Sequence, residues 1–388
     1  MNSHLKFGIE EEYFITELDT RRMAAQPPDA SIEACKALMG ACFAYEMFQC
    51  QIEVASPIFT GMAEAEDYFV AARENLRRTL EPFGLGLLCT GSHPLADWRI
   101  QQPNRQDHFL QLFEDYQCVA RRSVLSGLHV HVEVPGHLDR VQVMNEVLPW
   151  TPLLLALSCS SPFWDGADSG FMSYRQTVCD EWPRMGIPEY FEDEPDYEAY
   201  LALLMRTGAL RQASECWWGV RPAARYPTLE LRMTDACPRL EDALCIASLF
   251  RLLVACAIDQ AGPGLAYSPA SRRILNENRW RAERYGIHAS FIVEGYDRPF
   301  SAEQWLFLAQ QILGDTASKL RVDSVFLRAR KILRDGASAD RQRNLYRQAL
   351  RRSEDVHAAL TQVVDQLLME TTQAPCKSED LQRSVCQS

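Results

Sequence analysis

Alternating apolar and polar residues predict several short strands, mainly within the first 235 residues of the chain. The clearest strand is expected at residues 125–134, where valines occupy one face and histidine or glutamate side chains occupy the other. The same alternation, or a short buried run, predicts further strands at residues 6–18, 49–55, 85–90, 216–221 and 227–234. A turn that contains proline joins the last two strands.

Apolar residues that recur every three to four positions predict the helices. We expect these at residues 31–42, 62–80, 107–123, 138–158, 197–207 and 240–258, with a loop at 160–175, a linker at 262–269 and a mostly helical remainder up to residue 369. The strands do not alternate regularly with helices. The pattern therefore favours an antiparallel or mixed sheet with helices packed on one side, which is an α+β fold.

The composition is that of an ordinary globular protein, with 47% of the 388 residues hydrophobic and 24% charged. A net charge of -12 would repel phosphate backbones and anionic lipid, so we expect neither nucleic acid nor a membrane surface as a partner. No stretch reaches the roughly 18 apolar residues of a membrane helix, and residues 1–9 lack a signal-peptide pattern. We therefore expect a cytoplasmic protein, whose 13 cysteines, without any C-x-x-C pair, are free thiols.

Glutamates gather on one face of two predicted strands. Glu10 and Glu12 share a face, with carboxylates about 7 Å apart, whereas Glu11 points to the opposite face. Glu53 lies between apolar residues of the next strand, and Glu46 precedes that strand. These acids fit either a solvated strand face or a site where a cation lies between carboxylates that would otherwise repel each other.

The strand at 125–134 presents His129, His131 and Glu133 on one face. Imidazole and carboxylate groups both bind divalent metals, and the valines behind them would hold them rigidly. Taken alone, this face is compatible with an exposed strand, with a zinc or iron centre, or with a site for another divalent ion.

Glu230 and Arg232 share a face of the strand at 227–234, either as an ion pair or as a site that holds a polyphosphate with a cation and a guanidinium. Four strands with charged or imidazole side chains on one face are harder to explain by chance than any single one. Packed into one sheet, they would form an oxygen-rich cluster, which favours Mg²⁺ or Mn²⁺. Since the chain has no P-loop and no G-x-G-x-x-G turn, nucleotide binding would depend on these ions.

With these residues in view, the chain resembles the carboxylate–amine ligase family, also called glutamate–cysteine ligase type 2, within the glutamine synthetase-like superfamily. The resemblance runs from about residue 6 to about residue 369. Its motifs are residues 8–12 (Gly-Ile-Glu-Glu-Glu), 46–54, 127–132 (Gly-Leu-His-Val-His-Val), 160–175, 217–218 (Trp-Trp), 228–232 (Thr-Leu-Glu-Leu-Arg) and 278–281 (Asn-Arg-Trp-Arg).

The resemblance implies an α+β fold in which a curved antiparallel β-sheet forms a funnel with helices on its outer side, as in glutamine synthetase and guanidino kinases. It implies one catalytic domain at residues 1–373, followed by a polar tail at 374–388. ATP and Mg²⁺, with Mn²⁺ as a substitute, would be the cofactors, and small amino acids or amines the substrates. A homodimer would cover an edge of such a sheet.

The resemblance also assigns roles to individual residues. The implied metal ligands are Glu10, Glu12, Glu46, Glu53, His129 and Glu230. The implied substrate or nucleotide contacts are His131, Arg175, Arg232, Arg279 and Arg281, with Arg175, Arg232 and Glu53 as catalytic groups. Relatives usually carry glycine where this chain has Glu133, so we expect a different acceptor specificity.

The implied reaction joins a carboxylate, taken as the γ-carboxyl of glutamate, to cysteine or another amine through an acyl phosphate. Glu53 or Glu133 is the expected base for the amine proton. Two alternatives remain: phosphoryl transfer of the guanidino-kinase type on the same fold, and a metal hydrolase built on His129, His131 and Glu133. Trp217 and Trp218 belong either to the wall of the site or to the core.

Overall fold

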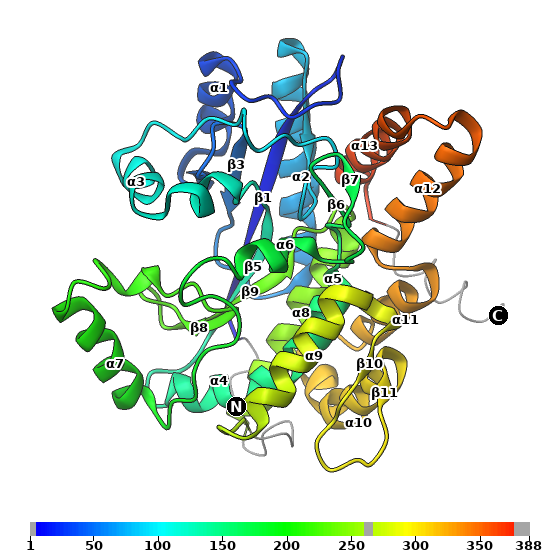
Figure 1. The fold of residues 1–388 in the computed structure, drawn as a ribbon. Helices are drawn as coiled ribbons and strands as arrows, with labels where there is room; N and C mark the ends of the chain where they lie inside the picture. Colours follow the sequence, from blue (N-terminus) through cyan, green and yellow to red (C-terminus); the bar gives the residue numbers. More distant parts are fainter. Residues whose placement is uncertain (1–4, 260–266, 376–388) are drawn as a thin grey trace.

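A seven-stranded antiparallel sheet runs through the centre of the computed structural model, which describes residues 5–259 and 267–375 (Figure 1). Along the sheet the order is β2-β3-β1-β5-β9-β8, and β4 pairs with the C-terminal half of β1. The antiparallel pairing confirms the predicted α+β class. The strands are β1 (Phe7–Glu17), β2 (Phe43–Tyr45), β3 (Gln51–Ala55), β4 (Leu85–Leu88), β5 (Gly127–Glu133), β8 (Val220–Pro222) and β9 (Thr228–Asp235).

The helices agree with the apolar periodicity at all six predicted places, although residues 138–158 divide into α4, a short 3₁₀ turn and α5. The helices are α1 (Asp29–Met39), α2 (Met62–Leu80), α3 (Asp107–Arg122), α4 (Arg140–Val147), α5 (Thr151–Ser158), α6 (Tyr174–Cys179), α7 (Glu194–Arg206), α8 (Leu240–Ile258), α9 (Ser271–Tyr285), α10 (Ala302–Leu320), α11 (Val325–Asp335), α12 (Ser338–Ser353) and α13 (Val356–Thr372).

Two short hairpins were not predicted. The first, β6 (Phe163–Trp164) with β7 (Ala167–Asp168), lies inside the expected loop at 160–175, and the second is β10 (Ser290–Phe291) with β11 (Phe300–Ser301). Strands of two residues are too short to show an alternating pattern. Most of the predicted linker at 262–269 and of the tail at 374–388 lies outside the described residues.

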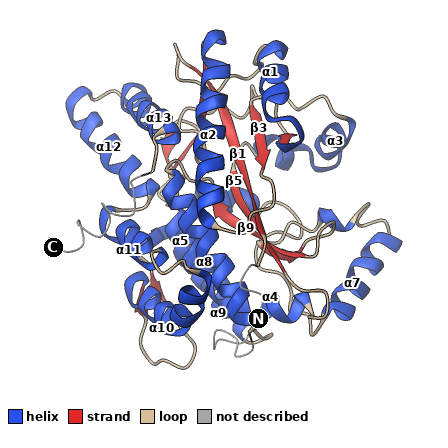
Figure 2. Ribbon diagram, turned by 180° about the vertical axis from the view of Figure 1, so that it is seen from behind, coloured by secondary structure: helices blue, strands red, loops and turns tan. Residues whose placement is uncertain are grey.

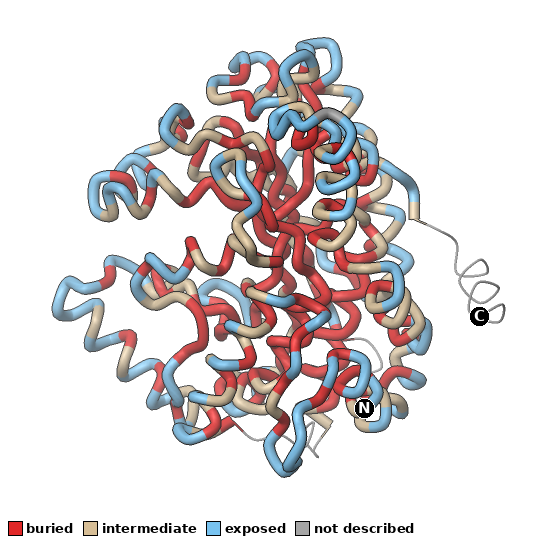
Figure 3. Tube along the Cα trace, turned by 45° about the vertical axis from the view of Figure 1, so that its right-hand side comes forward, coloured by how far each residue is buried: buried red, intermediate tan, exposed pale blue. Residues whose placement is uncertain are grey.

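The two faces of β1 have different tasks. Ile9, Tyr13 and Ile15 are buried on the face that packs against α2 and α8, and these helices cross the sheet in the view from behind (Figure 2). Glu10 and Glu12 point to the opposite face, as the period of two residues requires. Buried residues are concentrated in the middle of the molecule (Figure 3), and the core cluster includes residues of β1, α2 and α8. Among the described residues, no helix combines the length and the apolar character needed to cross a bilayer.

Glu11 is the one acid of its motif that points into the core, where it forms a buried ion pair. The Arg73 guanidinium donates to both carboxylate oxygens, at 2.9 and 2.5 Å, and Tyr13 donates a further hydrogen bond to Glu11. Arg73 also donates to the backbone carbonyls of Cys237 and Thr371. This pair therefore ties β1, α2, the β9–α8 connection and α13 together.

Arg73→Leu is expected to lower the free energy of unfolding by about 3–5 kcal/mol, because it leaves the Glu11 carboxylate buried without its partner. The matched control is Arg78→Leu on the same helix, since that side chain is 67% exposed and its ion pair contributes about 1 kcal/mol or less. Urea denaturation followed by circular dichroism measures both. Equal losses in the two variants would contradict the role given to the buried pair.

Candidate active site

Three cross-strand pairs bring predicted residues together on the face of the sheet that points away from α2 and α8. The directly opposed pairs are Glu10 with His129, Glu12 with Glu53, and His131 with Glu230. Side chains opposed in an antiparallel pair have Cβ atoms about 4.5–5.5 Å apart. The register of β3, β1, β5 and β9 is therefore what assembles the cluster from four separate segments.

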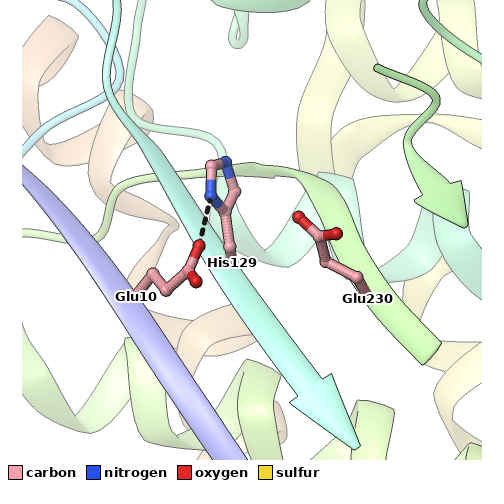
Figure 4. Close-up of side chains that lie close together, drawn as sticks. All are labelled: Glu10, His129 and Glu230. Carbon is pink, nitrogen blue, oxygen red and sulfur yellow. Dashed lines mark hydrogen bonds and ion pairs between the residues drawn. The ribbon is translucent and has the colours of Figure 1, made fainter. Parts of the chain in front are cut away.

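His129 lies at the centre of the cluster. Its Nδ1 is 3.2 Å from Glu10, and one ligand atom each from Glu10, His129 and Glu230 fall within 4.8 Å of one another (Figure 4). Burial and the nearby Arg232 lower the pKa of His129 to about 4, so the ring is neutral at pH 7, which is the form that binds metals. Its buried Nε2 has no hydrogen-bond partner in the described part of the chain and lies 3.5 Å from Glu12.

Glu12 and Glu53 face each other and form a second potential ligand group with His129, again within 4.8 Å. Burial and the neighbouring Glu46 raise the pKa of Glu12 to about 8, although the Gly127 N–H donates to it at 2.5 Å. Burial, with Glu10, Glu46 and Glu12 nearby, also raises the pKa of Glu53. Crowded carboxylate oxygens beside an unpartnered imidazole nitrogen fit a divalent cation, which would remove the repulsion.

His131 occupies the edge of this cluster. Its Nδ1 is 3.0 Å from the Thr228 hydroxyl, and its Nε2 is 3.2 Å from Glu10 and 3.9 Å from Glu230. Burial opposes the charged ring, but the two carboxylates outweigh burial and raise the pKa of His131. The two histidines of one strand face therefore differ: His129 is neutral and central, and His131 carries a proton more readily.

Glu230 is held between two arginines. Arg221 donates to Oε2 at 2.8 Å and Arg232 donates to Oε1 at 2.6 Å. Burial opposes ionisation, yet Arg232 and Arg221 together hold the pKa of Glu230 far below its ordinary range. Arg221 was missed in the sequence, since its position opposite Glu230 depends on the β8–β9 register, and the pattern predicted both strands but not their register.

A β-bulge in β9 lies at Arg232 and Met233. Val130 pairs with Leu231 and Leu128 with Thr234, so Arg232 and Met233 both lie opposite His129. The N–H groups of Arg232 and Met233 both donate to the carbonyl of Gly219, at 2.7 and 3.1 Å. The register before the bulge already places Arg232 opposite His129, and the extra residue shifts the pairing of the residues that follow while both backbone N–H groups stay bonded.

A cavity of about 240 Å³ opens next to these side chains. Its polar lining contains predicted residues from the sheet and from two other segments, namely Glu12, Glu46, Glu53, His129, Arg175 and Arg232. The rest of the wall includes Trp217, whereas Trp218 packs in the core against Phe191 and Tyr200. The tryptophan pair is thus divided between the two roles that the sequence left open.

Arg175 is brought to the cavity by the serine-rich loop that precedes it. Asp235, at the end of β9, accepts hydrogen bonds from the backbone N–H of Ser160 at 2.9 Å and from the hydroxyls of Ser161 and Ser173 at 2.7 and 2.8 Å. Ser161 in turn accepts from the backbone N–H of Arg175 at 3.1 Å. Asp235 was also missed, because its partners lie more than 60 residues away in sequence.

Three residues that were predicted from the sequence to act in the site lie away from the carboxylate cluster. Arg279 pairs with Asp180 at 2.8 Å and with Glu283, and Arg281 pairs with Glu277 within α9. Glu133, at the end of β5, accepts from the backbone N–H of Lys6 at 3.3 Å. Within residues 5–259 and 267–375, no contact joins Arg279, Arg281 or Glu133 to the carboxylate cluster.

Comparisons with known proteins agree with this geometry. The model of glutamate–cysteine ligase family 2 matches residues 6–365. A Pseudomonas fluorescens protein, named as a provisional glutamate–cysteine ligase 2, is 53% identical over 366 residues, which cover 94% of each chain.

Two solved structures share the fold at low sequence identity. A glutamate–cysteine ligase from Francisella tularensis, in complex with AMP, has a TM-score of 0.70 at 13% identity and covers 98% of this chain and 91% of its own. A bifunctional glutathione synthetase from Pasteurella multocida has a TM-score of 0.70 at 14% identity, covering 95% of this chain and 53% of its own.

Because Glu12 is buried close to Glu46, the stability of the metal-free protein is expected to depend on pH. A carboxyl group whose pKa rises from 4.5 to about 8 on folding retains a proton that the unfolded chain releases, so stability falls as the pH rises between these values. Glu12→Gln is expected to remove part of this loss. Urea unfolding in EDTA, from about pH 5 to about pH 8, measures the difference between the two proteins.

The advantage of Glu12→Gln over the unsubstituted protein should grow with pH, and Mg²⁺ should stabilise the unsubstituted protein more than the variant. A difference that stays constant across the pH range would contradict the crowding of Glu12. Glu198→Gln, an exposed substitution on α7, is the control for the loss of one carboxylate.

Proposed function

Because the chain belongs to glutamate–cysteine ligase family 2, we propose that the carboxylate cluster on its sheet is the active site of an ATP-dependent carboxylate–amine ligase. The donor would be the γ-carboxyl of glutamate, and the acceptor cysteine or another amine. The observation that carries this proposal is the arrangement around His129, where two groups of potential metal ligands and Arg232 meet beside one cavity.

The cluster offers two places for divalent cations, for which we propose Mg²⁺. Glu10, His129 and Glu230 would hold one ion, and Glu12 and Glu53, with Glu46 beside them, would hold another. When bound, such ions neutralise the charge of the ATP phosphates and of the transferred phosphoryl group. The crowding of Glu12 and Glu53 supports this role, because a cation converts their repulsion into attraction.

Arg232 and Arg175 would bind the anionic groups of the substrates. One nitrogen of Arg232 donates to Glu230. The other N–H groups of Arg232 can donate to the phosphoryl oxygens, whose negative charge grows in the transition state. Arg175 is 6% exposed, lines the cavity, and its Nε has no partner in the described part of the chain. A substrate carboxylate would satisfy this donor.

The reaction would proceed in two displacements. A carboxylate oxygen of glutamate bonds to the γ-phosphorus of ATP as the bond to the β,γ-bridging oxygen breaks, and ADP leaves. The amine nitrogen then bonds to the acyl carbon. At the same carbon the bond to the phosphate oxygen breaks, and phosphate leaves. Glu53 is the better placed of the two predicted bases for the amine proton, because it lines the cavity whereas Glu133 bonds to Lys6 at the strand end.

We also propose that residues 1–373 act as one catalytic unit. The family model spans residues 6–365. Arg73 of α2 donates to the carbonyl of Thr371 in α13, so the last described helix is bonded to the core beneath the site.

Hydroxylamine provides a test that does not depend on knowing the acceptor, since it attacks acyl phosphates and yields a hydroxamate. With ATP, Mg²⁺ and glutamate, we expect γ-glutamyl hydroxamate and one equivalent of phosphate for each. The hydroxamate is measured as its coloured iron complex. A stable phosphorylated product without hydroxamate would instead support a guanidino-kinase reaction, and no turnover of ATP would contradict the ligase.

Glu230→Gln is expected to lower hydroxamate formation by about 100-fold or more, because it removes a charged group that both arginines contact and that would bind a cation. Initial rates at saturating ATP measure the effect, and circular dichroism checks the fold. Glu198→Gln, on the surface of α7, serves as the control with unchanged activity. Near-normal turnover in a folded Glu230→Gln variant would refute the site.

A further inference from the structure

The cavity beside the cluster has two chemically different ends. One end carries the carboxylates of Glu12, Glu46 and Glu53. The other is lined by apolar side chains from α3, from the connection between α3 and β5, from the segment after α6 and from the segment before β8. This apolar wall consists of Phe109, Leu112, Leu125, Trp182, Met185 and Trp217, and the other apolar lining residues are Met47, beside Glu46, and Cys179. The proposed reaction uses the polar end of the cavity and assigns no role to this apolar wall.

The wall is held in place by its own contacts. The indole N–H of Trp182 donates to the Ser123 hydroxyl at 2.5 Å, and the Trp182 ring lies 4.6 Å from Tyr116 and 5.2 Å from Trp217 between centroids. Arg184 donates to the Tyr116 hydroxyl at 3.1 Å. Since the polar atom of Trp182 is already bonded, this ring offers a ligand only apolar surface.

The position of the wall points to the acceptor rather than to the nucleotide base. Adenine is separated from the γ-phosphorus of ATP by a ribose and two phosphates. The wall, by contrast, shares with Glu12 and Glu53 one cavity of about 240 Å³, which is below the range of about 300–1,000 Å³ for pockets that hold drug-sized ligands. A group bound against the wall therefore shares this cavity with Glu12 and Glu53, beside which the amine would react.

We propose that the acceptor is a primary amine that carries a large apolar side chain, aromatic or branched aliphatic, and that Trp182 and Met185 select it. This inference rests on the proposed function and names its substrate class. The amine would point to the carboxylate end, and the side chain would cover the wall and displace water from it. A small polar side chain, such as that of cysteine, would leave the wall uncovered and find no partner on Trp182.

Two sources share this chemistry, an α-amino acid and the amine formed by its decarboxylation. Arg175 lines the same cavity, and its Nε has no partner among the described residues. Its guanidinium would bind an α-carboxylate, which distinguishes the two. Phenylalanine and leucine represent the first source, and phenethylamine and isopentylamine the second.

The first experiment measures phosphate release and the mass of the γ-glutamyl product with ATP, Mg²⁺ and glutamate. The acceptors are the four apolar compounds, cysteine and alanine. We expect kcat/KM for the best apolar acceptor to exceed that for cysteine and alanine by about 10-fold or more. Preference for phenylalanine over phenethylamine identifies the amino acid as the source, and the reverse preference identifies the amine.

The second experiment tests the wall itself. Trp182→Ala and Met185→Ala are each expected to lower kcat/KM for the apolar acceptor by about 10-fold, while hydroxamate formation and the KM for ATP stay within about 3-fold. Met185 is half-buried, so its variant decides the question if Trp182→Ala does not fold. Phe307→Ala, on the exposed surface of α10, is the matched control.

The outcomes separate this inference from the function on which it rests. Hydroxamate formation with cysteine as the best acceptor overturns the inference and retains the ligase. A rise in the KM for ATP in both wall variants, with the acceptor preference unchanged, assigns the wall to adenine and also overturns it. Absence of hydroxamate under all conditions refutes the ligase.

Discussion

The opposition of Glu12 and Glu53 across β1 and β3 is the constraint on which the site depends. Like charges directly opposed in an antiparallel sheet destabilise it, and burial increases the cost, as the raised pKa of each carboxyl group shows. The core on the other face of β1 must offset this cost. The packing of Ile9, Tyr13 and Ile15 under α2 and α8 thus stabilises a site that is unfavourable by itself.

Four acids of β1, β3 and β9 fall into two electrostatic classes. Glu11 and Glu230 are neutralised by arginines within the fold, by Arg73 in the core and by Arg221 and Arg232 at the site. Glu12 and Glu53 have no such partner at ion-pair distance in the described residues, so their charge is available to a bound cation. One end of the cluster therefore combines guanidinium groups with a carboxylate, which suits a phosphate bound together with a cation, and the other end favours a cation alone.

Support for the reactive groups comes from neighbours that have no chemical task themselves. Asp235 accepts hydrogen bonds from two serines of the loop that leads to Arg175. The carbonyl of Gly219 accepts hydrogen bonds from both N–H groups of the bulge that contains Arg232. Ser123 and Tyr116 hold Trp182 in the same way at the apolar end. Such contacts fix side-chain geometry, which catalysis by positioned charge requires.

The sequence by itself determined six of the seven strands of the central sheet, most helices and the shared face of Glu10 and Glu12. Periodicity and alternation are local properties of the chain, so they can be read without the fold. Its motifs also identified the family. Only the tertiary structure decided that Arg221 meets Glu230, that Asp235 holds a distant loop, and that Trp217 lines the cavity while Trp218 is buried. Register, bulges and contacts between distant segments follow from the packing of the whole chain, which no local pattern encodes.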